Sequence, residues 1–148
     1  MKNLLFLFIA SCCIISCSQN GYNSISPILI GKGDLYGNGK EQIAKQCLVI
    51  NTSSEWNQLL VKMNSVNLVS TGFLETNIDF SIYTVIAIFD EVRMNNGYSI
   101  TINMVESDNK IIVNVQYSTT NGGSVASVIT QPYKIVKINK SNKVIVFN

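Results

Sequence analysis

Cysteines are the most informative of the residues in this sequence that could do chemistry. Four are present, at Cys12, Cys13, Cys17 and Cys47. Cys17 ends the segment Ile14-Ile15-Ser16-Cys17, which has the aliphatic, small and cysteine pattern of a bacterial lipoprotein box. In such a box the thiol accepts a diacylglyceryl group, and a small preceding residue lets the peptidase cut just before the cysteine. The pattern therefore predicts lipidation at Cys17.

The residues before Cys17 have the composition of a secretory signal. Residues 1–3 carry one positive charge, and residues 4–15 are almost wholly apolar. This apolar run is shorter than the roughly 20 residues that a membrane-spanning helix needs. We predict a signal peptide over 1–16, a lipidated tether over 17–27 and a single domain over 28–148. The mature protein would then be held in the bacterial cell envelope by its N-terminal lipid. The absence of acidic residues at 18–20 favours the periplasmic face of the outer membrane.

Composition excludes several classes of function. The chain has 148 residues, with 11 basic and 9 acidic side chains and no histidine. Without an imidazole there is no Ser-His-Asp hydrolase, and a zinc site is nearly impossible. A net charge of +2 provides no field for nucleic acid. Cys47 would be the one cysteine left after lipidation, so no intramolecular disulfide is available, and its apolar neighbours predict burial. We expect no metal and no cofactor.

Carboxylates offer the remaining route to catalysis. Asp79, Asp90 and Glu91 are the candidates for an enzyme that needs only acid–base pairs. The favoured interpretation of Asp90-Glu91 is solvated charge at the end of a strand. Asp34 and Asn38 lie among glycines, but they lack the ligand spacing of a calcium loop. A small-ligand or glycan binder also stays open, and would need an apolar pocket lined by Tyr and Phe. We expect a protein that is not an enzyme.

One helix must form part of the framework. Residues 52–55, Thr-Ser-Ser-Glu, match a capping box, in which a hydroxyl and a carboxylate satisfy backbone amides at the helix start. Trp56, Leu59, Leu60 and Met63 follow at helical spacing, which places them on one face. The pattern predicts an amphipathic helix that ends at residues 64–67.

The other elements are predicted as strands. Residues 83–89 are continuously apolar, as in a central strand covered on both faces. Residues 99–105 and 111–117 alternate around Asp108-Asn109, which predicts a hairpin. Further strands are expected at 28–30, 43–50, 125–138 and 144–147, with turns at Gly31, Gly33, Gly37 and Gly39 and an edge, bulge or bend at Pro132. The expected fold is α+β: about seven mostly antiparallel strands, sandwich- or barrel-like, with one helix packed on them.

Several short segments resemble the PrcB C-terminal domain family. They are Asp79-Phe80-Ser81, Val85-Ile86-Ala87-Ile88-Phe89, Asn96-Gly97-Tyr98-Ser99-Ile100 and Thr130-Gln131-Pro132-Tyr133-Lys134 with the apolar residues after it. The resemblance extends over roughly residues 45–148. The chain departs from the family pattern at Asn96, where a glycine is usual, at Thr119-Thr120, where a proline is usual, and at Asn139, again in place of proline.

This resemblance implies an accessory role without catalysis. Members are similar to lipoproteins that stabilise or tether a secreted or surface protease. The family segments supply the candidate partner contacts, which are Asp79, Phe80, Gly97, Tyr98, Ser99, Pro132 and Tyr133. Gly97 also suits a backbone of positive φ, and Tyr98 suits a buried ring with a satisfied hydroxyl.

Overall fold

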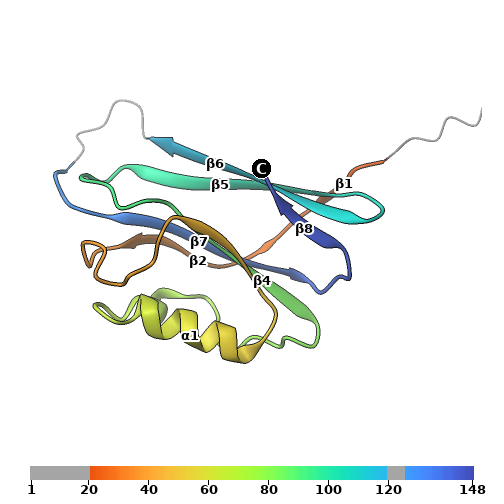
Figure 1. Cartoon of the computed structure of the whole chain (residues 1–148), viewed down its shortest axis with the longest axis horizontal. Coiled ribbons are helices and arrows are strands. Elements are labelled where there is room, and N and C mark those ends of the chain that lie inside the picture. The colour runs from red at the N-terminus through yellow and green to blue at the C-terminus, as the bar shows by residue number, and fades with distance from the viewer. Residues whose placement is uncertain (1–20, 120–125) are drawn as a thin grey trace, which may run out of the picture.

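The computed structural model describes residues 21–119 and 126–148, and it shows two packed β-sheets with a helix on one of them (Figure 1). The elements in chain order are β1 (Asn23–Ile25), β2 (Ile28–Leu35), β3 (Gln46–Ile50), α1 (Ser53–Met63), a 3-10 turn (Val69–Gly72), β4 (Tyr83–Phe89), β5 (Tyr98–Glu106), β6 (Lys110–Thr119), β7 (Gln131–Asn139) and β8 (Val144–Phe147). The predicted α+β class is confirmed: the described residues form a sandwich of eight strands and not a closed barrel.

The sheets form the first two of three layers. The outer sheet has the strand order β1-β5-β6-β8, and the middle sheet has the order β2-β7-β4-β3. All neighbours are antiparallel except β6 and β8, which run parallel. Helix α1 covers the face of the middle sheet that points away from the outer sheet (Figure 1).

Strand β4 lies in the middle sheet with both faces covered, as its continuous apolar sequence predicts. Val85, Ala87 and Phe89 belong to the core under α1, whereas Ile86 and Ile88 belong to the core between the sheets. All five side chains are fully buried. This explains why β4 lacks polar alternation.

Helix α1 begins at the predicted capping box. The Glu55 amide donates to Thr52 Oγ1 at 3.2 Å, and the Thr52 amide donates to Glu55 Oε2 at 3.1 Å. Trp56 and Met63 are buried against the middle sheet, and the indole N–H of Trp56 donates to the Thr76 carbonyl at 2.8 Å. The helix ends at Asn64, as expected.

The predicted hairpin is formed by β5 and β6. The Ser107 amide donates to the Lys110 carbonyl at 2.9 Å and closes the turn. Ile100, Met104, Ile111 and Val113 point toward the middle sheet and are buried, as the alternation requires.

The N-terminal part of the domain differs from the expectation. Asn23–Ile25, in the segment predicted as a tether, pairs with β5 as β1. Gly31 and Gly33 lie inside β2 and do not form turns. A Cβ at Gly31 would lie 2.6 Å from the ring of Phe73, so glycine is needed there for close packing. Gly37 and Gly39 are in a turn, as expected.

Two predicted strands are shorter than their apolar segments. The expected strand over 43–50 begins at Gln46, and the expected strand over 125–138 corresponds to β7, which begins at Gln131. Cys17 and the predicted signal peptide over 1–16 lie outside the described residues. No helix among the described residues is long and apolar enough to cross a membrane.

Candidate functional site

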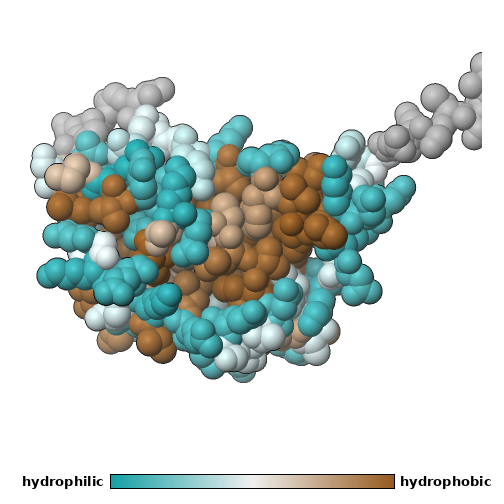
Figure 2. Space-filling view, in the orientation of Figure 1, coloured by the Kyte–Doolittle hydropathy of each residue, from teal (hydrophilic) through white to brown (hydrophobic). Residues whose placement is uncertain are grey.

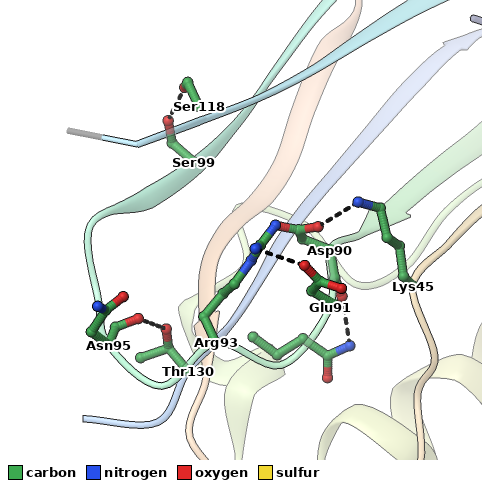
Figure 3. Close-up of polar contacts among 9 residues, drawn as sticks. Lys45, Asp90, Glu91, Arg93, Asn95, Ser99, Ser118 and Thr130 are labelled. Carbon is green, nitrogen blue, oxygen red and sulfur yellow. Dashed lines mark hydrogen bonds and ion pairs between the residues drawn. The ribbon is translucent and has the colours of Figure 1, made fainter. Parts of the chain in front are cut away.

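A buried carboxylate, Asp90, is the centre of a polar cluster where β4 ends (Figure 3). Its side chain is 1% exposed. Lys45 Nζ lies 2.9 Å from Oδ1, and Arg93 donates to Oδ2 from Nε at 3.0 Å and from Nη2 at 2.8 Å. The expectation that Asp90 is solvated is therefore wrong. It holds for the adjacent Glu91, which is 56% exposed and pairs with Arg93 Nη1 at 2.6 Å.

The two cations decide the ionisation of Asp90. Burial by itself would raise the pKa of this carboxyl, but the contacts with Lys45 and Arg93 outweigh burial and hold the pKa below its ordinary value. Asp90 is thus ionised at neutral pH and is held by both cations. A buried charge of this kind is tolerated because it is paired and hydrogen-bonded.

Tyrosines from the outer sheet cover both cations. The guanidinium carbon of Arg93 lies 4.5 Å from the ring centre of Tyr98, and Lys45 Nζ lies 4.0 Å from that of Tyr117. Cations at this distance from a ring face are attracted by its quadrupole. The cluster therefore links the end of the middle sheet to the hairpin β5–β6.

Tyr117 also contacts Cys47, the cysteine that the sequence analysis expected to be buried. Burial raises the pKa of Tyr117 to about 12, and the neighbouring Cys47 adds to the shift. Burial likewise raises the pKa of the Cys47 thiol, although the hydrogen bond with Tyr117 and the charge of Lys45 oppose it. Cys47 is partly buried against the core between the sheets, so its environment favours the unreactive thiol form.

Backbone bonds hold the loop that carries Arg93. The Arg93 amide donates to the Thr130 carbonyl at 2.7 Å, and the Thr130 amide donates to the Arg93 carbonyl at 3.0 Å. The Thr130 hydroxyl donates to the Asn95 carbonyl at 3.1 Å (Figure 3). These bonds fix the guanidinium between Asp90 and Tyr98.

Gln131 replaces a hydrogen bond that Pro132 cannot make. The Asp90 amide donates to the Pro132 carbonyl at 3.0 Å, which continues the β4–β7 ladder by one residue. Pro132 has no amide to return this bond, and the Gln131 side-chain amide donates to the Asp90 carbonyl instead, at 2.9 Å. The same nitrogen donates to the Ile43 carbonyl at 2.7 Å. Pro132 thus lies at the start of a strand inside the sheet, where it is compatible with the ladder.

A groove lies beside the cluster, between the two sheets. It encloses about 420 Å³, and its walls are Lys32, Gly33 and Asp34 of β2, Tyr98, Ser99, Ile100 and Thr101 of β5, and Pro132, Tyr133 and Lys134 of β7. The structure therefore brings together four of the predicted contact residues, Tyr98, Ser99, Pro132 and Tyr133. Gly97 precedes them, with φ +93°, in agreement with the predicted positive φ.

These groove residues differ in their exposure. Ser99 is exposed, with its hydroxyl 2.9 Å from that of Ser118 on β6. Pro132 and Tyr133 are buried. The Tyr133 ring packs against Phe73 and Phe89, and burial raises the pKa of its hydroxyl. Ser99 is thus accessible to a partner, whereas Tyr133 mainly packs in the core.

Asp79 and Phe80 lie at the opposite end of the middle sheet. Tyr83 pairs with Asn139 near them, whereas Phe89 pairs with Tyr133 at the groove, and the seven-residue β4 spans about 20 Å between these ends. The Asp79 carboxylate accepts bonds from the amide and hydroxyl of Ser81, which lower its pKa. Phe80 packs against the core under α1. These two residues shape a turn away from the groove.

A hydrophobic surface lies on the side of the sandwich where β3 and β8 are the edge strands. Figure 2 shows this side, with a continuous hydrophobic band between the two strands. On β3, β6 and β8 the partly buried residues that pack on the core between the sheets are Cys47, Val115, Tyr117, Ile145 and Phe147. The band is a second surface suited to protein contact.

Several residues of the cluster were not identified from sequence. Lys45, Arg93 and Gln131 all bond to Asp90, and only one of them carried a visible signal. Arg93 is the single arginine of the chain and stands three residues after Asp90. That spacing could have suggested a pair, but nothing local indicates that the carboxylate is buried.

A comparison with known protein families matches the part of the chain that contains most of the Asp90 cluster. Residues 84–139 match the family model described as PrcB C-terminal. This match covers part of the chain and supports the resemblance to the PrcB C-terminal family that the sequence segments indicate. The segment extends from β4 to the end of β7, so it contains Asp90, Arg93, Gln131 and the β5 and β7 residues that line the groove. No curated protein and no solved structure matches the chain.

Proposed function

We propose that this protein is a non-catalytic accessory subunit of the bacterial cell envelope, anchored by lipid at Cys17, that binds and stabilises a secreted or surface protease. The PrcB C-terminal family supports the accessory role, and the lipoprotein box supports the anchor. The expected location is the periplasmic face of the outer membrane.

The observation that carries this proposal is the groove that the family segment forms together with β2. It places exposed Ser99 beside an ion-paired cluster, and among the described residues 98–103 of β5 pair only with β6, which leaves their other edge accessible. A rigid scaffold that presents an accessible edge is suited to binding a partner, since little conformational entropy is lost on association.

The carboxylates argue against the alternative of an acid–base enzyme. A general acid needs a carboxyl whose pKa is raised toward neutrality, and the pKa of Asp90 is lowered. Glu91 is exposed and Asp79 lies at the other end of β4. These features favour a binding role over acid–base catalysis by these three carboxylates.

The test is site-specific photocrosslinking in native cells. A photoreactive residue replaces exposed Ser99 at the groove, and a matched variant carries it at exposed Lys62 on α1. We expect a crosslinked envelope protein, identified by mass spectrometry as a protease or its direct partner, from position 99 and not from 62. No adduct at 99, or the same adducts at both positions, would count against the accessory role at this site.

A further inference from the structure

Strand β5 has an edge that no strand of the described chain covers along most of its length. β1 pairs only with Met104–Glu106, in the register Asn23↔Glu106 to Ile25↔Met104. After Ile25 the chain leaves this edge and enters β2 of the other sheet. Within the described residues, 98–103 of β5 therefore pair only with β6. Unpaired amides and carbonyls along such an edge are a template for another strand.

Two lysines face each other below this free edge. Lys32 of β2 and Lys134 of β7 are direct cross-strand partners. Lys134 alternates with Val136 and Ile138, which lie in the core between the sheets, so both lysines are on the face that points toward the outer sheet. Like charges in directly opposed positions repel each other. Neither lysine forms an ion pair with any described residue.

The environment of this pair favours an added anion. Burial lowers the pKa of Lys134, and the charge of Lys32 lowers it further. A carboxylate between the two ammonium groups would oppose both effects, because it favours the charged form of each lysine. Asp34 lines the same groove without pairing to either lysine, and its Oδ1 is buried with no hydrogen-bond donor. Burial raises the pKa of the Asp34 carboxyl.

The free edge and the lysines form opposite walls of one groove. Tyr98–Thr101 of β5 line one side, and Lys32, Asp34 and Lys134 line the other. A strand added to β5 in line with β1 would alternate its side chains, sending every second one toward the middle sheet. Those inward side chains would lie over the lysine pair. The backbone edge thus selects an extended segment, and the lysines select its charge.

We propose that this groove binds an extended peptide segment that adds to the free edge of β5 and places an Asp or Glu side chain between Lys32 and Lys134. The inference deepens the proposed function, since it assigns the chemistry of the partner segment. Electrostatic recognition of this kind weakens as salt concentration rises.

The experiment selects ligands for the full-length chain, purified in detergent, from a displayed library of random nonapeptides. We expect enrichment of an acidic residue at one position of an alternating pattern. The selected peptide is then synthesised in three forms: unchanged, with its acidic residue replaced by the matching amide, and with N-methylated backbone amides. Fluorescence anisotropy should give about three- to tenfold weaker binding for the amide form and loss of binding for the N-methylated form.

Variants of the protein locate the site. Lys32→Gln/Lys134→Gln should reduce binding of the acidic peptide to the level of the amide form. The matched control Lys62→Gln/Lys110→Gln removes two exposed lysines elsewhere and should bind as the parent does. Thermal unfolding followed by Trp56 fluorescence checks that both double variants are folded. In NMR spectra, the peptide should shift the amide signals of residues 98–103.

Three results would overturn the proposal: no acidic enrichment, equal affinity for Lys32→Gln/Lys134→Gln, or undiminished binding of the N-methylated peptide. The last result would show recognition of charge without strand addition. Crosslinking at Ser99 together with no acidic enrichment would retain the accessory role and reject only the acidic strand. Acidic enrichment without a crosslinked envelope protein would retain the acidic strand and reject the accessory role.

Discussion

The Asp90 cluster predicts that substitutions of its members lower the free energy of unfolding by different amounts. Asp90 is 1% exposed, Arg93 is 23% exposed and Glu91 is 56% exposed. Removing one partner of a buried ion pair costs about 3–5 kcal/mol when a charge is left buried. Because Lys45 remains beside Asp90, we expect Arg93→Met to lower the free energy of unfolding by an amount at the lower end of this range, about 3 kcal/mol.

Substituting the carboxylates should cost less. Asp90→Asn leaves two cations that are partly exposed and can turn to water, so we expect a loss of about 1–3 kcal/mol, as for an ordinary buried hydrogen-bonded group. Glu91→Gln is the matched control, because it removes the exposed carboxylate bound to the same guanidinium. Its cost should stay below about 1 kcal/mol, as for a surface ion pair.

Urea unfolding followed by fluorescence measures these changes, since Trp56 is the single tryptophan and is 2% exposed. The free energy of unfolding should fall most for Arg93→Met, less for Asp90→Asn and least for Glu91→Gln. A loss for Glu91→Gln equal to that for Arg93→Met would refute the assignment of the buried pair.

The same cluster predicts a pH dependence. The pKa of Asp90 is lower in the folded protein than in the unfolded chain, where it is about 4. Its stabilisation is therefore complete above about pH 4 to 5 and is lost as pH falls through the folded pKa. In Asp90→Asn this part of the acid-side slope should disappear. An unchanged slope in that variant would contradict the lowered pKa.

Three further variants test separate features. Cys17→Ala should move the protein from the detergent phase to the aqueous phase in phase partitioning, and continued detergent partitioning would exclude the lipid anchor. Gln131→Ala leaves the carbonyls of Ile43 and Asp90 without their donor, so urea unfolding should show a loss of about 2–3 kcal/mol; a loss under half of this would show that other groups replace the amide. Gly97→Ala introduces a side chain at φ +93°, which is strained for residues other than glycine. The free energy of unfolding in urea should therefore fall by about 1–2 kcal/mol. An unchanged unfolding midpoint would mean that the backbone at this position relaxes without strain.

Elements with strong local patterns could be predicted from the sequence. The capping box at Thr52, the apolar stripe after it and the alternating hairpin strands depend on neighbours within a few residues, and all are present in the structure. The continuous apolar run of β4 likewise indicated a strand covered on both faces.

Features that depend on distant contacts could not be predicted. Gly31 resembles a turn residue in sequence, but it is required because the ring of Phe73 lies against β2. β1 has three residues, of which only Ile25 is apolar, and it is recognised as a strand by its pairing with β5. Buried Asp90 is paired with Lys45 and Arg93, whose cations contact two tyrosine rings. Lys45 and the tyrosines come from distant parts of the sequence.

The position of the family segment in the two sheets has a consequence for folding. β4 to β7 supply the central pair of each sheet, β5–β6 in one and β7–β4 in the other, and the four flanking strands come from outside the segment. Pairing β4 with β7 closes a long loop, which is entropically unfavourable. If the β5–β6 hairpin forms first, fewer unstructured residues separate β4 from β7, and closing the loop costs less entropy. We therefore expect the hairpin to nucleate folding, and β1, β2, β3 and β8 to join a two-layered centre that is already formed.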